Sequence, residues 1–231
     1  MLVTVQELLT TQIKFLLLQP VCIDLNRQFW SWFIFVLAVT WLVGVGRYWD
    51  HPSAETWQYL GLGSVAYVFC LSTLIYLVVW PLRPENWQFR GILIFVGLTS
   101  LPAILYAIPV EQLVELRTAQ LLNAWFLGAV ALWRVALFIR YLLVSAKLHW
   151  FVTLTVTVLL LSGIVATLSI LNLEHVVFDL MAGIREEDAS PNDTAYLIVL
   201  GLAVFALYAF PVSLLIYFGA IVHRQQSKRR G

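Results

Sequence analysis

The sequence predicts an all-α protein: a polytopic membrane helix bundle of about six transmembrane helices, preceded by an N-terminal interfacial helix. Hydrophobic residues make up 61% of the 231 residues and charged residues only 12%, too few to cover the surface of a soluble domain. The apolar residues form runs of roughly 20, the length at which an α-helix crosses a hydrocarbon core of ~30 Å. These runs are continuously apolar, which excludes the alternating strands of a membrane barrel.

Residues 1–20 have the pattern of an amphipathic helix. Its apolar positions recur at helical spacing, and polar residues take the other side; the apolar set is Leu2, Val5, Leu9, Ile13 and Leu16, and the polar set is Gln6, Glu7, Thr10 and Lys14. Two interpretations stay open: a helix lying in the membrane interface and a short helix packed against the bundle. The only charge before Lys14 is acidic and no small-residue cleavage site follows, so we expect the segment to be retained and not removed as a signal peptide.

One membrane domain is predicted over residues 21–222, and a basic tail over residues 223–231. The six apolar runs are Phe29–Gly46, Trp57–Trp80, Phe89–Ile108, Ala119–Leu143, Trp150–Leu171 and Ala195–Val222. Tryptophans lie near several of their ends, where an amphipathic ring is favoured. The gaps between the runs are too short for a separate soluble domain.

The basic residues predict the orientation. With six spans and the N-terminus inside, ten Lys or Arg residues fall on the cytoplasmic side and three on the other, a bias that the positive-inside rule associates with cytoplasmic loops. We therefore expect both termini in the cytoplasm. The three on the outer side are Arg47, Arg117 and Arg185.

Arg134 is the one ionisable side chain well inside an uncharged membrane-length run, the fourth. At ~1.5 Å per residue it lies ~22 Å from the outer end, in the cytoplasmic third. Gln120 and Asn123 fall with Arg134 in about a 60° sector of the helix, at 100° per residue. Such a stripe should face protein or a wet cavity, because unpaired polar groups are costly in hydrocarbon. We expect this helix to be central to the bundle.

Two roles for the stripe are left open, with the structural one favoured. In the first, Gln120 and Asn123 join helices by hydrogen bonds and Arg134 caps carbonyls or reaches the inner surface. In the second, Arg134 lines a path for an anion or a lipid headgroup. No Asp or Glu lies inside any predicted span, which disfavours a proton-driven carrier, since such proteins relay protons through intramembrane carboxylates.

Prolines and cysteines add weaker signals. Pro102 and Pro211 fall inside the third and sixth runs and should bend or break those helices; this is common in membrane helices, and we favour the ordinary interpretation over a binding site. Cys22 and Cys70 are far apart in sequence and are interpreted as two buried thiols.

No catalytic or metal site is predicted. Serine has no histidine partner inside a span, and the paired intramembrane aspartates and the zinc motif are absent. Glu174, His175 and Asp179 have a spacing that suits a metal, but a solvated loop face is favoured. The tail residues Arg224, Lys228, Arg229 and Arg230 anchor the topology or contact anionic lipid headgroups, with the anchor favoured.

A family resemblance rests on the middle of the chain. Leu105-Tyr106-Ala107-Ile108-Pro109, then Asn123 and Trp133-Arg134, resemble bacterial membrane proteins of the Yip1-like type, over about a third of the sequence. The resemblance implies a small multispanning protein of a bacterial inner membrane, without enzymatic activity, in which Tyr106, Pro109 and Trp133 belong to a shared motif. The chain lacks the Asp-Leu-Tyr-Gly-Pro signature of the eukaryotic branch, so no trafficking role follows.

The sequence therefore favours a non-enzymatic inner-membrane protein that organises membrane or serves as a partner-binding subunit. Its alternative is a small permease or channel-like protein with a polar path along the fourth helix, and a membrane-bound hydrolase or transferase is a weaker third. The expected partners are the lipid bilayer, and anionic headgroups or another membrane protein; we expect no cofactor, no metal and no nucleic acid.

Overall fold

The structure, a computed structural model, describes residues 3–49, 55–171 and 194–230, and every regular element in these ranges is helical. The predicted all-α fold is confirmed. The helices are α1 Val5–Leu16, α2 Leu25–Tyr48, α3 Thr56–Tyr59, α4 Leu62–Val79, η1 Trp80–Leu82, α5 Phe89–Leu98, η2 Leu101–Ala107, α6 Val110–Leu113, α7 Leu116–Val144, α8 Trp150–Ile170 and α10 Thr194–Arg230.

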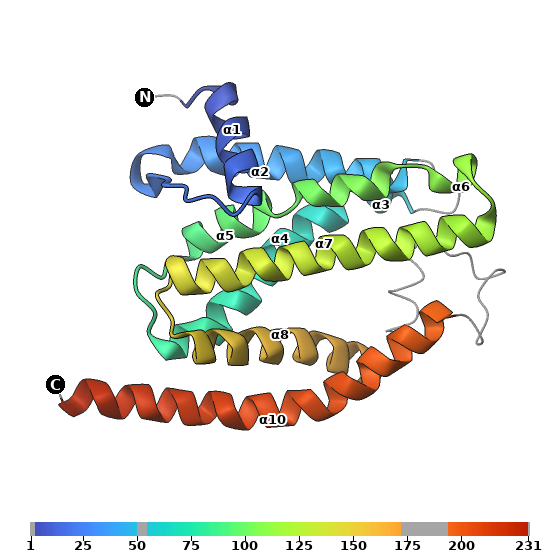
Figure 1. The fold of residues 1–231 in the computed structure, drawn as a ribbon. Coiled ribbons are helices and arrows are strands. Elements are labelled where there is room, and N and C mark those ends of the chain that lie inside the picture. Colours follow the sequence, from blue (N-terminus) through green and yellow to red (C-terminus); the bar gives the residue numbers. More distant parts are fainter. Residues whose placement is uncertain (1–2, 50–54, 172–193, 231) are drawn as a thin grey trace.

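Six of the described helical stretches are long and apolar enough to cross a membrane. They follow α2, α4, α5 with η2, α7, α8 and α10, and they run back and forth along one axis, with α1 laid across them (Figure 1). The N-terminal helix and the C-terminal end of α10 lie towards the same end of the bundle (Figure 1). An even number of spans requires this arrangement, so the fold agrees with termini on one side of a membrane.

The second predicted run is divided at Gly61. Gly61 has a φ of 65°, in the left-handed region, and it separates the short α3 from α4. A Cβ there would lie 2.8 Å from the carbonyl oxygen of Trp41, so the helices could not approach as closely with any other residue. The indole nitrogen of Trp41 donates to the carbonyl of Leu60 over 2.8 Å, which ties α2 to this turn.

The third predicted run is also divided, at its centre. The α-helical part ends at Leu98, and a 3₁₀ helix begins at Leu101 and contains Pro102. Proline has no N–H to donate to the carbonyl four residues back, so it ends the α-helical ladder there. This span is the most enclosed of the six: 61% of its most apolar stretch is buried, compared with 28% for the fourth. The expectation that the fourth helix is central was wrong, because α5 and η2 occupy that place.

Helix α1 packs against the bundle, as one of the two interpretations predicted, but with a different face. Its buried residues are Leu8, Gln12 and Leu16, and Leu8 and Leu16 pack with side chains of α2, α5 and α7. Of the predicted apolar face, Leu16 is buried, whereas Val5, Leu9 and Ile13 are exposed. The predicted and observed faces differ because Gln12 is buried. A pattern of apolar residues cannot predict the burial of a polar side chain whose hydrogen bond is satisfied inside the protein.

The last two long helices, α8 and α10, pack side by side (Figure 1). Helix α10 continues through Pro211 and is bent, not broken (Figure 1). It also continues past residue 222 to Arg230, so the backbone of the predicted tail is an extension of the last helix. Cys22 and Cys70 are free thiols, but both are exposed, which corrects the prediction that they are buried.

Candidate functional site

The break in the third span leaves two backbone carbonyls without their usual helical donors. The oxygen of Leu98 would accept from residue 102, which is proline and has no N–H. The oxygen of Thr99 would accept from Ala103, but that N–H donates instead to Ser100 at 3.0 Å, in the tighter 3₁₀ pattern. An unpaired carbonyl inside a membrane is costly, so both oxygens need donors from elsewhere.

Side chains from two distant helices supply these donors. Gln12 of α1 is fully buried, and its Nε2 donates to the carbonyl of Leu98 over 3.3 Å. Arg134 of α7 donates through Nε to the carbonyl of Thr99 over 3.0 Å. The broken helix thus binds α1 and α7 through its own backbone, and this polar centre, made of Gln12, Arg134 and the two carbonyls, is the candidate site.

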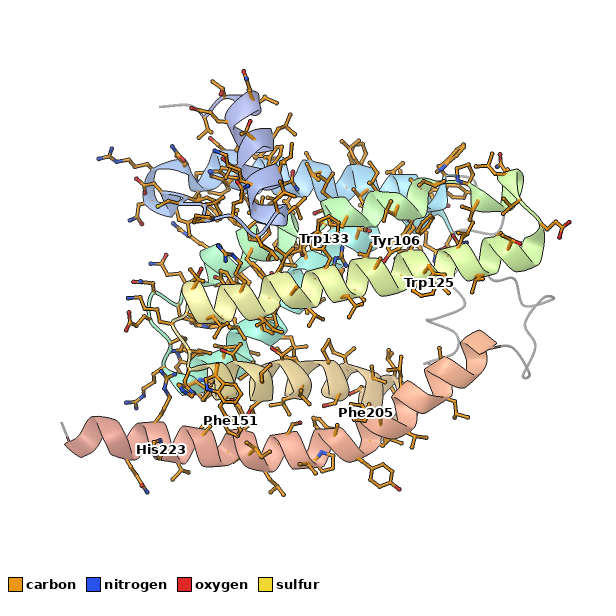
Figure 2. The ribbon with its side chains drawn as sticks, viewed as in Figure 1. Tyr106, Trp125, Trp133, Phe151, Phe205 and His223 are labelled. Carbon is orange, nitrogen blue, oxygen red and sulfur yellow. The ribbon has the colours of Figure 1, made fainter. Side chains whose placement is uncertain are left out.

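Two further hydrogen bonds close the polar centre. The hydroxyl of Thr40 on α2 donates to the Ser100 hydroxyl over 2.8 Å. The indole nitrogen of Trp133, a residue of the suggested family motif, donates to the carbonyl of Leu16 over 2.9 Å and so caps the last turn of α1. Figure 2 shows Trp133 on α7 close to the end of α1. The structure therefore gives neighbouring residues Trp133 and Arg134 the same task, donating to backbone carbonyls of other elements.

The predicted stripe on α7 does face protein. Leu127, Val130 and Leu137, which lie on the same side of the helix as Arg134, are buried, and Arg134 itself is half-buried. Asn123 is half-buried and engaged in an interaction of its own; the side chain of Gln120 lies outside the described residues. The stripe is thus one face of α7 turned towards α5 and η2.

The guanidinium of Arg134 lies deeper than the cytoplasmic third that its position along α7 predicted. Its acceptor, Thr99, is at the middle of the third span, between Phe89 and Ala107. Since α5 and η2 rise by about 1.5 and 2.0 Å per residue, the two halves have similar lengths. The charge therefore lies near the midplane of the bundle. No carboxylate among the described residues forms an ion pair with it.

Two tyrosines and a second arginine lie near this centre. The guanidinium carbon of Arg134 lies 5.8 Å from the ring centre of Tyr67 on α4, and that of Arg47 on α2 lies 5.4 Å from the ring of Tyr106 on η2. Tyr106 interacts electrostatically with Arg134, Arg47 and Tyr67, so the four side chains form one cluster. In Figure 2, Tyr106 lies between η2 and α7. We call these four residues the Arg–Tyr cluster.

The remaining motif residue, Pro109, lies outside this cluster. It follows η2 and precedes α6 as its N-cap residue, with φ of −79°. Proline fixes φ near this value, which suits the position before a helical turn. Its place in the fold is therefore the end of the third span, where it starts the short α6.

Arg224, predicted to contact lipid headgroups, is half-buried at the end of α4. Its Nη1 donates to the carbonyl of Leu82 over 2.8 Å, and the hydroxyl of Tyr217 donates to Val78 over 2.7 Å. These bonds satisfy carbonyls at a helix end that Pro81 terminates. The side chains of Lys228, Arg229 and Arg230 lie outside the described residues. The contact of the tail with headgroups stays a prediction.

Gln12, Tyr67 and Arg47 are site residues that the sequence did not single out. Gln12 lies midway between Leu8 and Leu16 at four-residue spacing, on the face of α1 that is buried, but its acceptor comes from a distant segment. The described residues contain no group of three His, Cys, Asp or Glu that could hold a metal. Glu174, His175 and Asp179 lie outside the described residues.

Searches against protein-family models, curated proteins and solved structures find no match for this chain. Its function must therefore be argued from the site alone.

Proposed function

We propose that this chain is a non-enzymatic integral membrane protein that acts as a partner-binding or membrane-organising subunit. The six apolar helices are compatible with an integral membrane protein. The observation that supports a role in binding or organisation is the hydrogen bonding of Gln12 and Arg134. Each donates to a backbone carbonyl of the broken third span. Polar groups used in this way hold three elements together, which is the task of a scaffold.

This arrangement favours a scaffold over a permease with a polar path through the membrane. A permease needs polar groups that exchange with solvent along a continuous line, whereas Leu127, Val130 and Leu137 on the same face of α7 are buried and apolar. They separate Asn123 from Arg134, and Arg134 from the far end of the helix. The stripe is therefore interrupted on both sides of the charge.

The second candidate, a small permease or channel-like protein, is supported by one observation. Arg134 is only half-buried, and a charge near the midplane that is not sealed off can line a cavity. We keep this candidate as the alternative to be tested.

Thiol accessibility separates the two candidates. In a Cys22→Ser, Cys70→Ser background, single cysteines replace Leu127 and Leu137, and a membrane-impermeant maleimide is applied from each side in turn. A scaffold predicts that neither position reacts, whereas a permease predicts that both react. Ser145, exposed in the α7–α8 connection, provides the matched position that should react once cysteine is introduced there.

Partner binding needs its own readout. A photo-crosslinking residue replacing the exposed Trp125 on α7, activated in native membranes, should give one discrete adduct with a different polypeptide at constant stoichiometry. Lipid adducts alone, together with labelling at both core positions, would overturn the scaffold and favour the permease. The resemblance to Yip1-like proteins, the location in a bacterial inner membrane and the cytoplasmic termini remain parts of this proposal; protease protection of a tag on each terminus tests the last.

A further inference from the structure

Helix α1 lies level with the middle of the spans. Its Leu8 belongs to one buried apolar cluster with Val36 and Leu98, and the carbonyl of its Leu16 accepts a hydrogen bond from Trp133. These three partners lie at or next to the midpoints of the candidate spans Leu25–Arg47, Phe89–Ala107 and Leu121–Val144. In a membrane that the six spans cross, α1 therefore lies at the depth of the hydrocarbon.

Two opposite charges lie on the side of α1 that faces away from the bundle. The helix buries the face that carries Gln12, whereas Glu7 and Lys14 are exposed. Because seven residues separate these two charges, they point within about 20° of each other, roughly 10 Å apart along the helix. One oxygen of Glu7 accepts from the N–H of Thr4 over 3.0 Å, but neither charge forms an ion pair within the described part of the chain. Exposed charges without an opposite charge are costly at this depth.

This charged face is complementary to a second copy of itself. Helix α1 lies across the spans (Figure 1), so a two-fold axis parallel to the spans turns it end to end and keeps both copies in the same orientation in the membrane. Glu7 then faces the partner's Lys14, and Lys14 faces the partner's Glu7. Glu7, Thr10, Lys14 and Leu17 also recur at alternating spacings of three and four residues, as in a helix that packs along another helix. Lipid tails would leave both charges unpaired.

We propose that α1 is the contact surface between two copies of this chain, which pair antiparallel through Glu7 and the partner's Lys14. The ion pair occurs twice because of the two-fold axis, which passes between Thr10 and Thr11, midway between the charges. The hydrogen bonds of Gln12 and Trp133 hold α1 on the bundle in advance, which reduces the entropy lost on pairing. This inference does not rest on the partner-binding function, because a scaffold and a permease can each form a dimer.

Crosslinking of the full chain in native membranes tests the contact. In a Cys22→Ser, Cys70→Ser background, Thr10→Cys places one thiol next to the two-fold axis, and a short bis-maleimide is added. We expect a crosslinked homodimer. The matched control is Val5→Cys, because Val5 is 68% exposed on the same helix but points about 160° away from Glu7. This control should give no homodimer.

Charge reversal tests the ion pairs, with two differently tagged copies that both carry Thr10→Cys. Glu7→Lys alone, or Lys14→Glu alone, places like charges opposite each other, and the crosslinked homodimer should be lost. When the two variants are produced together, one copy carries two glutamates and the other two lysines, so the mixed pair is complementary. We expect a crosslinked heterodimer of the two tags. Its recovery also shows that each variant folds, although Glu7→Lys removes the capping box of α1.

Three results would overturn the proposal. The first is the absence of a homodimer with Thr10→Cys, or equal crosslinking with Val5→Cys. The second is a homodimer that persists in Glu7→Lys and Lys14→Glu, which would mean that the charges do not hold the copies together. The third is labelling of Thr10→Cys by a membrane-impermeant maleimide without a dimer, or an adduct with a different polypeptide alone; water or another protein would then cover this face of α1.

Discussion

The Nε atom of Arg134 lies 3.0 Å from the carbonyl oxygen of Thr99, at the point where the third span changes from α-helix to 3₁₀ helix. The arginine has no acidic neighbour in its span, and it donates instead to a backbone carbonyl that lost its helical donor at the break near Pro102. This pair links the charged side chain of the fourth span to the break in the third, and the first prediction tests it.

Replacing Arg134 should cost stability according to whether the new side chain can donate to Thr99. Arg134→Leu leaves that carbonyl unpaired and should lower the free energy of unfolding by about 1–3 kcal/mol. Arg134→Gln retains a donor and should cost less than Arg134→Leu. Thermal unfolding of the detergent-solubilised protein measures both, and equal losses for the two variants would contradict the hydrogen bond as the cause.

Gln12 and Pro102 should be energetically coupled. Gln12→Leu removes the donor to Leu98 and should be destabilising by about 1 kcal/mol. In a Pro102→Ala background, residue 102 regains an N–H that can serve the same carbonyl, so the cost of Gln12→Leu should fall. A double-mutant cycle in the free energy of unfolding checks this; additive costs would mean that Gln12 does not act by replacing the donor that proline lacks.

Trp133 should hold α1 on the bundle. Trp133→Phe keeps an aromatic ring but removes the N–H that donates to Leu16. We expect faster amide hydrogen exchange across residues 5–16, because local opening of α1 becomes easier. Trp125→Phe, at an exposed position on the same helix, is the control and should leave exchange in α1 unchanged. If both variants behave alike, the indole N–H does not secure α1.

Two helical glycines should respond in opposite ways to alanine. A Cβ on Gly97 of α5 would lie 2.5 Å from the Cβ of Val36, so Gly97→Ala forces α2 and α5 apart and should cost about 1–3 kcal/mol. A Cβ on Gly128 of α7 meets nothing within 4 Å, so Gly128→Ala should be stabilising by up to about 1 kcal/mol through helix propensity. Unfolding midpoints measure both; destabilisation by Gly128→Ala, or none by Gly97→Ala, would contradict the packing of these helices.

The ion pair between the α4–α5 and α7–α8 connections gives a pH dependence. The Nζ of Lys147 lies 2.7 Å from Glu85, and the hydrogen bond and charge of Glu85 raise the pKa of Lys147 above its usual 10.5. Because the pKa is raised in the folded state, the contribution to stability is present below the ordinary pKa and is lost as the pH rises through the folded value.

We therefore expect the unfolding midpoint of the wild type to fall more steeply above pH 10.5, the ordinary pKa of lysine, than that of Glu85→Gln. The effect should be small, since the pair is exposed. Parallel curves for the two proteins over this range would show that the pair adds nothing to stability.

Much of the fold was predictable, because length and apolarity are local properties. A run of roughly 20 apolar residues has few ways to satisfy its backbone in lipid other than a helix, so six spans follow from composition and order. The division of the third span into an α-helix and a 3₁₀ helix was harder to predict from the sequence. Pro102 signalled a bend, but whether a helix bends, as at Pro211, or breaks depends on donors that come from elsewhere in the chain.

The site divides in the same way. The sequence identified Arg134 from its cost in hydrocarbon and the inward face of α7 from helical periodicity. It could not identify Gln12, since the value of a buried amide depends on the carbonyl of Leu98, 86 residues away. The sequence analysis also predicted that both thiols are buried, whereas both are exposed. For Cys70, the surrounding residues are apolar whether the thiol lies inside the bundle or on its outer face, so the sequence does not distinguish the two.

By itself the sequence determined an all-helical membrane protein with six apolar spans, a costly arginine in the fourth and no acidic residue in any, because hydrophobicity and charge act on each segment separately. Only the tertiary structure decided which span is central, which face of α1 is buried, and that Arg134 and Gln12 reach the carbonyls of Thr99 and Leu98. Those outcomes depend on pairing donors with acceptors between distant segments. When a helix break leaves a carbonyl without its helical donor, the sequence does not indicate which distant side chain will donate to it.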